Sequence, residues 1–294
     1  MPHINDAHCH FFSTPFFASL GGDRALATLG WDPPGSAEAL ADRWAAELDR
    51  HQVRRCALIA TMPGDAASVV TAVERHRSRF VGFFMVDPTR PDAETTTNAA
   101  LATGALRTIC LYPSMHGYAI GDARAQRVFD LAAAISGTAV FVHCGVLSVG
   151  VRKKLGLPSP FDLSRGNPVA LQAVATRYPT VPIIVPHFGA GFFREALMLA
   201  DMCPNVHFDT SSSNAWLAYY PGLTLADVFR QALEVAGPDR LLFGTDSSFF
   251  PRGWVVDVYQ RQAAALDQIG AGEAVKRKIL RDNFDRIFPV GGRA

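Results

Sequence analysis

The sequence has 294 residues, of which 49% are hydrophobic and 19% charged, a balance typical of a globular protein with a large core and not of a disordered chain. Its 28 basic and 27 acidic residues leave a formal net charge of +1, which excludes the basic surface expected of a protein that binds nucleic acid or anionic membranes. We therefore expect a small-molecule partner, no nucleic acid and no membrane. The high hydrophobic fraction is also compatible with a buried homodimer face.

The five cysteines are widely spaced and include no Cys-x-x-Cys pair, so the sequence indicates neither a disulfide framework nor a thiolate zinc site. No apolar run approaches the ~20 residues that a membrane span needs. No signal-peptide pattern precedes the first expected strand. We expect a reduced, cytoplasmic setting.

The first expected strand runs from His3 to His10. Because side chains alternate along a strand, Asp6, His8 and His10 should share one face, where two imidazoles could grip one metal ion. A His-x-His motif also arises by chance, so by itself it is only a candidate site. The aromatic residues 11–35 follow, which predicts a wall or lid of a binding site or, equally, a loop packed on its own rings. A helix should then start after Ser36.

The rest of the chain alternates between apolar runs and helical patterns. The expected strands are residues 55–60, 80–86, 106–112, 138–143, 181–187, 206–209 and 240–246. The expected helices between and after them are around residues 69–76, 92–102, 127–134, 168–177, 192–202, 225–236 and 255–269. Eight strand–helix units favour a (β/α)8 TIM barrel over an open doubly wound sheet. We expect residues 1–294 to form this single domain, with an additional C-terminal helix at 273–288.

Four of the expected strands end in polar residues, which are His8 and His10, His143, His187, and Asp246. Active sites of such barrels gather at the carboxyl ends of the strands, so these five residues should face one mouth. A single histidine at a strand end is more often a packing or capping residue, but several together beside a His-x-His motif indicate a site. Imidazole and carboxylate are ligands that Zn²⁺ selects, and an ion with one open position would activate water. Asp246 could hold the metal or move protons, and His187 could hydrogen-bond the water or polarise a substrate.

Four segments together resemble the amidohydrolase superfamily, and more narrowly its amidohydrolase-related group that contains aminocarboxymuconate-semialdehyde decarboxylase. They are Asp6-x-His8-x-His10, Val142-His143-Cys144-Gly145, Pro186-His187-Phe188-Gly189-Ala190-Gly191 and Phe243-Gly244-Thr245-Asp246. The terminal Asn283-x-x-Arg286-Ile287-Phe288 is similar to that group's last helix.

The resemblance implies that His8, His10, His143 and Asp246 are metal ligands and that His187 is an unligated catalytic histidine. Binuclear members of the superfamily bridge two metals with a carboxylated Lys or a Glu on a central strand. This chain has only four lysines, none of them on such a strand, and no Glu between Glu94 and Glu195. We therefore expect one divalent ion, with zinc as the first expectation and manganese as the alternative.

Two residues near the expected strand ends are candidates for contact with a substrate. Arg252, shortly after Asp246, could pair with a substrate carboxylate or could be a solvated loop residue. Tyr112 lies just past the fourth strand and is a second candidate for substrate binding. The insertion 147–167 could be part of a lid or an exposed charged face.

Three functions remain open at this point. The first is a metal-dependent hydrolase that activates water for attack on a small lactone, ester or amide. The second is a metal-dependent non-oxidative decarboxylase or hydratase, a carboxy-lyase type of enzyme acting on an aromatic or muconate-like carboxylate. The third is a non-catalytic barrel that binds a small ligand.

Overall fold

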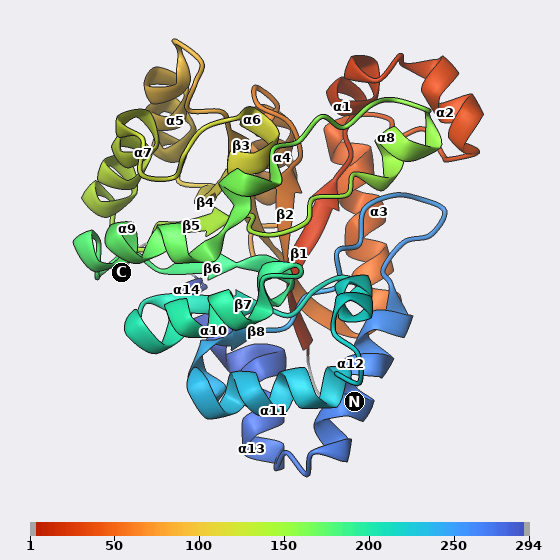
Figure 1. Cartoon of the computed structure of the whole chain (residues 1–294). Helices are drawn as coiled ribbons and strands as arrows, with labels where there is room; N and C mark the ends of the chain where they lie inside the picture. Colours follow the sequence, from red (N-terminus) through yellow and green to blue (C-terminus); the bar gives the residue numbers. More distant parts are fainter. Residues whose placement is uncertain (1–3, 291–294) are drawn as a thin grey trace.

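The computed structural model describes residues 4–290, and its eight strands form one parallel sheet in the order of the chain (Figure 1). The strands are β1 (Ile4–Phe11), β2 (Val53–Ala60), β3 (Phe80–Val86), β4 (Leu106–Leu111), β5 (Ala139–Val142), β6 (Ile183–Val185), β7 (Val206–Asp209) and β8 (Leu241–Leu242). The last strand returns to the first, because Ala7 N donates to Phe243 O at 2.8 Å and Cys9 pairs in parallel with Ser247. The predicted (β/α)8 barrel is confirmed. His3, where the first strand was expected to begin, lies outside the described residues.

Helices cover the outside of this barrel (Figure 1). The helices are α1 (Thr14–Ser19), α2 (Asp23–Leu29), α3 (Ala37–Arg50), α4 (Ala66–Arg75), α5 (Ala93–Ala102), α6 (Pro113–His116), α7 (Ala123–Ala134), α8 (Gly150–Lys154), α9 (Gln172–Arg177), α10 (Phe193–Met202), α11 (Leu225–Val235), α12 (Val256–Gln268), α13 (Glu273–Arg277) and α14 (Asn283–Ile287). Short 3-10 turns join several of them, and a π-turn links α13 to α14. No helix of the described part of the chain is both long enough and apolar enough to cross a membrane.

Two layers of apolar side chains hold the barrel together. One lies between the strands and the helices and includes Trp44, Leu58, Phe129 and Phe229. The other fills the barrel interior and includes residues from the strands as well as Phe284 and Phe288 from the terminal segment. The expected terminal helix is therefore present, and it closes the amino-terminal end of the barrel. This leaves the opposite end, where the strands finish, for the candidate site.

The ends of β6 and β8 differ from the sequence-based expectation. Both strands were expected to run to the polar residues His187 and Asp246, but β6 ends at Val185 and β8 at Leu242. His187 has φ 56° and Asp246 has φ 62°, which is left-handed backbone that cannot continue a strand. Pro186 also has no N–H to donate to a sheet. The two functional side chains therefore come from tight turns just beyond the strands.

The expectation that Asp6 shares a face with His8 and His10 is wrong. The pairing of β1 with β2 is irregular between Asp6 and Cys9, so the alternation of side chains is interrupted there. The Asp6 carboxylate accepts hydrogen bonds from Thr245 N at 3.1 Å and Trp254 Nε1 at 2.7 Å. Burial raises the pKa of Asp6 to about 6, although hydrogen bonds from the Thr245 hydroxyl, His8 N and Trp254 oppose the shift. Asp6 thus ties β1 to the segment after β8 and accepts from His8 N at 2.9 Å, but it is not one of the three grouped ligand residues.

A histidine far from the candidate site should make the fold sensitive to acid. The His207 side chain in β7 is buried, and burial, with a smaller effect of Arg286 and Arg240, lowers its pKa to about 3. The unfolded chain takes up this proton near pH 6.5, so the stabilisation is present above that pH and is lost as the pH falls towards 3. We expect about 2 kcal/mol of unfolding free energy to be lost between neutral pH and pH 5 through this residue. In His207→Gln, the free energy of unfolding measured by urea denaturation should therefore fall less between neutral pH and pH 5. An equal pH dependence in the wild type and the variant would refute this prediction.

Candidate active site

Three possible metal-ligating atoms converge where β1 and the segment after β8 meet. His8 Nε2 lies 3.3 Å from His10 Nε2, and Asp246 Oδ1 lies 3.2 Å from His10 Nε2 and 3.6 Å from His8 Nε2. The two segments are joined by a hydrogen bond from Asp246 N to His8 O at 2.9 Å. Within residues 4–290, these three side chains are the group whose geometry could hold a metal ion.

The spacing of these atoms fits a zinc-type ion. Ligands at about 2.0–2.1 Å around a tetrahedral ion lie about 3.3–3.4 Å from one another. The three observed separations, 3.2 to 3.6 Å, bracket that value. Two imidazole nitrogens and a carboxylate oxygen are also a donor set that zinc and manganese accept in proteins. The residues present therefore fit one divalent ion.

Hydrogen bonds on the far side of each ring set the tautomers of His8 and His10. His8 Nδ1 lies 2.6 Å from Asp209 Oδ2, and a carboxylate at neutral pH can only accept, so Nδ1 carries the proton. Thr61 Oγ1 donates to Ile59 O at 3.0 Å and therefore accepts from His10 Nδ1 at 2.9 Å. In the neutral form of each ring, Nε2 then carries a lone pair directed at the common point, as metal ligation requires.

The sequence analysis missed Asp209, Ser211 and Thr61. Asp209 is fully buried and also accepts from Ser211 N at 2.8 Å. It is the last residue of β7, so a search for polar residues at strand ends, which selected the other candidates, could have found it. Burial raises the pKa of Asp209, but the charge and hydrogen bond of His8 outweigh burial, and the net pKa lies below the usual range. Ser211 and Thr61 gave no signal in the sequence, because isolated hydroxyl residues after strands are common.

The close packing of this layer depends on a glycine. A Cβ at Gly244 would lie 2.7 Å from Asp209 Oδ1 and 3.0 Å from the Cβ of His8. Carbon atoms do not approach so closely, so any other residue would push β8 away from the Asp209–His8 pair. The glycine in the Phe243-Gly244-Thr245-Asp246 segment thus leaves room for the Asp209–His8 pair.

His187 lies beside His8, with ring centroids 5.1 Å apart. Its Nδ1 lies 2.9 Å from Ser211 Oγ and 3.2 Å from Ser211 O. A backbone carbonyl only accepts, so the contact with Ser211 O favours the tautomer with the His187 proton on Nδ1 and the lone pair on Nε2. Burial is the main cause that lowers the pKa of His187, with the charge of His8 as a further cause, which keeps the ring neutral. Its role as a catalytic residue stays a prediction.

His143 lies next to the three-residue group but is not part of it. Its ring centroid is 5.4 Å from that of His187, and its Nδ1 has no hydrogen-bond partner among the described residues. Burial, together with the charges of His187 and His8, lowers the pKa of His143 well below the usual value. The ring is therefore neutral, the form in which imidazole binds metals. Its assignment as a fourth ligand stays a prediction.

Asp246 is the most accessible of the three grouped residues. Its side chain is 34% exposed, against 16% for His10 and 1% for His8. Burial raises its pKa, but the interactions with the neighbouring imidazoles of His10, His8 and His187 outweigh this, and the net pKa lies below the usual range. Asp246 is thus ionised at neutral pH and stands where a small molecule would enter.

The two predicted substrate-binding residues lie on different sides of the group. The Tyr112 ring stacks on His143 at 5.5 Å and is buried. Arg252 Nη2 lies 3.3 Å from Asp246 O, and its guanidinium stands 4.5 Å above the Phe249 ring. Both are thus close to the candidate metal ligands, while contact with a substrate stays a prediction.

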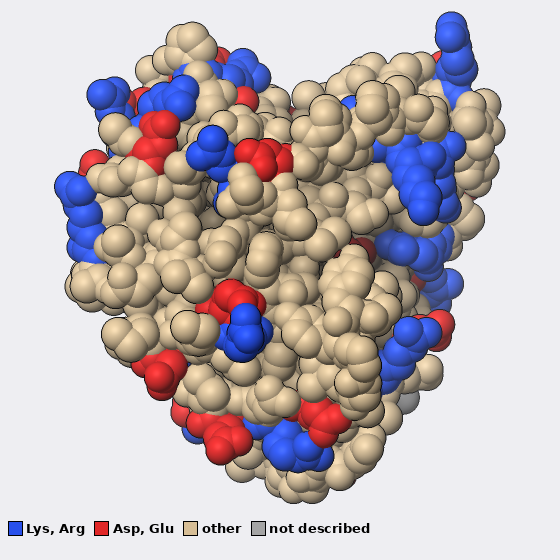
Figure 2. All heavy atoms as spheres, viewed as in Figure 1, with Lys and Arg blue, Asp and Glu red and all other residues tan. Residues whose placement is uncertain are grey.

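Residues 11–35 and 147–167 pack against each other beside the site. Phe12 stands 5.7 Å from the His10 ring, and Trp31 stacks on Phe249 at 3.6 Å. Lys154 of α8 places its Nζ 5.3 Å from the Trp31 ring. Figure 1 shows α1, α2 and α8 together in one lobe, and Figure 2 shows Lys and Arg side chains gathered over α8. The rings of residues 11–35 also pack on one another, as the second sequence-based interpretation expected, and a role of these segments as the wall of a binding site stays a prediction.

Thr61 should tune metal binding through His10. In Thr61→Val the Nδ1–H of His10 loses its acceptor, so the ring is no longer held in the ligating tautomer. We expect the affinity for zinc, measured by competition with a chelator, to fall about tenfold. Thr61→Ser keeps the hydroxyl and should bind zinc as the wild type does. Equal affinities for the valine and serine variants would refute this role.

The barrel and the His-His-Asp group together fit a metal-binding (β/α)8 protein. The amidohydrolase family model matches residues 6–290, and the chain therefore belongs to the amidohydrolase family. Members of this superfamily are enzymes that use divalent metals, hydrolases and decarboxylases among them. The resemblance inferred from the strand-end motifs is confirmed.

The comparisons also identify individual relatives. Over 139 residues, 45% of this chain, the sequence is 31% identical to Protein fluG of Emericella nidulans, but the alignment spans only 15% of that protein. The structure resembles 5-carboxyvanillate decarboxylase LigW from Sphingomonas paucimobilis, with 17% identity, a TM-score of 0.66, and 99% of this chain and 100% of that chain covered.

Two further solved structures have the same barrel. A zinc-bound amidohydrolase from Burkholderia multivorans has 15% identity and a TM-score of 0.64, with 98% and 99% of the two chains covered. A probable 2-pyrone-4,6-dicarboxylic acid hydrolase from Acinetobacter baumannii has 16% identity and a TM-score of 0.60, with 97% and 99% covered. At these identities the likenesses establish the fold.

Proposed function

We propose that this chain is a hydrolase that uses one divalent ion to activate water for attack on a small lactone, ester or amide. The observation that carries the proposal is the convergence of two Nε2 lone pairs and an ionised, accessible Asp246 carboxylate within 3.2 to 3.6 Å of one another. His8, His10 and Asp246 would hold the ion, with His143 as a further ligand. When bound, such an ion supplies Lewis acidity, which makes water more acidic and polarises a carbonyl.

Asp246 is suited to move the proton of the reaction. Only one of its carboxylate oxygens, Oδ1, lies in the contacts with the two histidines, which leaves Oδ2 to accept a proton from water. The same oxygen would return the proton to the leaving oxygen or nitrogen as the acyl bond breaks. The partial exposure of this side chain lets substrate and water reach it.

His187 is suited to orient the attacking water. Its lone pair is on Nε2, because Nδ1 donates to the Ser211 carbonyl. A neutral imidazole in this tautomer accepts a hydrogen bond from water at Nε2, whereas polarising a substrate carbonyl would require a proton on Nε2. The lowered pKa of His187 supports the first of these two roles.

A decarboxylase or hydratase is the second candidate, and Arg252 is the observation that favours it. Its guanidinium lies beside Asp246, where it would pair with the carboxylate of an aromatic or muconate-like substrate. The likeness to the LigW decarboxylase is a further reason to test this reaction.

One assay separates the three possible functions. Zinc- or manganese-loaded protein would be offered a panel of small lactones and of aromatic carboxylates, with ring opening and carbon dioxide release measured side by side. Ring opening supports the hydrolase, and carbon dioxide release would replace it with the second candidate. If compounds of the panel bind the metal-loaded protein but neither ring opening nor carbon dioxide release follows for any of them, the chain is a binding protein and the proposal fails.

A further inference from the structure

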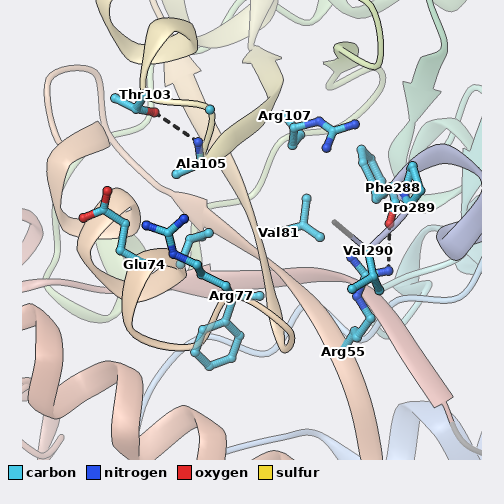
Figure 3. Close-up of a pocket in the computed structure, with 13 residues that line it drawn as sticks. Arg55, Glu74, Arg77, Val81, Thr103, Ala105, Arg107, Phe288, Pro289 and Val290 are labelled. Carbon is cyan, nitrogen blue, oxygen red and sulfur yellow. Dashed lines mark hydrogen bonds between the residues drawn. The ribbon is translucent and has the colours of Figure 1, made fainter. Parts of the chain in front are cut away.

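A cavity of about 330 Å³ lies at the end of the barrel opposite the metal group (Figure 3). Its lining includes Arg55 near the start of β2, Val81 near the start of β3 and Arg107 near the start of β4. The chain after α14, Phe288 to Val290, forms another side. Since the candidate metal ligands lie at the finishing ends of the strands, this cavity is separate from the site described above.

The polar lining of this cavity is mainly cationic. Three arginines, Arg55, Arg77 and Arg107, line it together with one carboxylate, Glu74. Figure 3 shows the three arginines on different sides of the cavity, with Val81 between them. Arginine carries its charge at all relevant pH values and presents a planar fork of donors that matches phosphate and carboxylate oxygens. An anion in the cavity could therefore meet donors from more than one direction.

Arg55 retains hydrogen-bonding capacity although it is only 3% exposed. Its Nη1 donates to Asp285 Oδ1 and to Phe288 O, both at 2.7 Å, but its Nε has no partner among the described residues. Asp285 also pairs with Arg54, so one carboxylate serves two guanidinium groups. Burial lowers the pKa of Arg55, and Asp285 only partly offsets this. A second negative charge nearby would stabilise this buried cation.

The other two arginines differ in burial. Arg107 is 7% exposed and donates from Nε to Gly137 O at 3.1 Å, which holds its guanidinium at the edge of the cavity. Arg77 is exposed at the opening, and no ion pair or hydrogen bond joins it to another residue within 4–290. Among the described residues, the lining of the cavity thus contains three guanidinium groups and one carboxylate, and Asp285, which pairs with Arg54 and Arg55, lies outside the lining.

We propose that this cavity binds a compact anion that carries at least two negative charges, such as a phosphate ester, a pyrophosphate or a small dicarboxylate. Three guanidinium groups in the lining can donate to several oxygens of such an anion, and the cavity volume is near the lower limit for small-molecule sites. The apolar side chains in the lining, among them Val73, Phe80 and Phe288, would pack against a short carbon skeleton. Such a ligand would link the starts of β2, β3 and β4 to the terminal segment.

The test uses the full-length, metal-free protein, so that the opposite end of the barrel holds no cation that could bind the anion. Pyrophosphate and malonate would be titrated separately by calorimetry at constant ionic strength, and the thermal unfolding midpoint would be followed in parallel. We expect saturable binding of at least one of them and a rise of the midpoint with its concentration. The stronger ligand then distinguishes phosphate from carboxylate recognition.

Arg77→Glu and Arg194→Glu form a matched pair of charge reversals. Both side chains are exposed, so both variants should fold as the wild type does, but only Arg77 lines the cavity. We expect Arg77→Glu to weaken anion binding by at least about tenfold and Arg194→Glu to leave it unchanged. If the two variants bound the anions equally, the effect would be one of net charge alone and the proposal would be overturned. So would the absence of saturable binding of both anions to the wild type.

Discussion

Asp246→Asn should lower the turnover number by about 10³-fold or more, while a substrate still binds with nearly unchanged affinity. The substitution keeps the shape of the side chain but removes the proton acceptor and one anionic ligand of the ion. Proton transfer by a positioned group typically contributes 10²–10⁴-fold to rate, and the lost ligand adds to this. The measurements are steady-state kinetics and, for affinity, calorimetry with a compound that the wild type turns over.

Asp201→Asn is the control for this prediction, because Asp201 is an exposed aspartate at the end of α10 and far in sequence from the cluster. It should retain wild-type turnover. If Asp246→Asn kept more than a tenth of the wild-type turnover number, Asp246 would not be the proton carrier.

Asp209→Asn should lower the affinity for zinc by 10- to 100-fold, although Asp209 is not expected to touch the ion. Asp209 accepts from both His8 Nδ1 and Ser211 N. An amide can accept at only one of these positions, and its NH₂ group would face the other donor. If it faces His8, the ring must move its proton to Nε2 and can no longer ligate the ion.

This effect can be observed without any substrate. Chelator competition gives the zinc affinity, and ¹⁵N chemical shifts of the histidine rings report which nitrogen is protonated. Ser211→Ala removes a 3.0 Å contact to the same His8 nitrogen and a 2.9 Å contact to His187 Nδ1, but it keeps the Asp209–His8 hydrogen bond and should have a smaller effect on zinc affinity. If Asp209→Asn bound zinc as tightly as the wild type, the Asp209–His8 hydrogen bond would have no role in preparing the ligand.

Much of the fold could be predicted, because strands buried on both faces read as short, continuous apolar runs. The runs at 80–86 and 106–112 correspond closely to β3 (Phe80–Val86) and β4 (Leu106–Leu111). The run at 240–246 corresponds to a strand of only two residues, because the chain turns into left-handed backbone at Asp246. Such a turn depends on local geometry that hydrophobic periodicity does not record.

The strand-end residues of the candidate site could be predicted from the sequence, whereas the residues that hydrogen-bond to the histidine rings were not. Strand-end position selected the five residues that the structure places at one mouth, but the partners that orient the rings are ordinary hydroxyl and carboxylate residues. Thr61 and Ser211 become recognisable only when their oxygens are seen within 3.0 Å of a histidine nitrogen. Asp6 was placed wrongly because the irregularity of β1 between Asp6 and Cys9 interrupts the alternation of its side chains.

The most direct test of the account is elemental analysis of the purified protein beside His8→Ala. His8 supplies one of the three converging ligand atoms, so its removal should abolish tight metal binding. We predict close to one zinc or manganese ion per wild-type chain and far less in the variant, with the same circular dichroism spectrum for both. A wild type that contains no such metal and takes none up on addition, or a variant that retains as much metal as the wild type, would contradict the account.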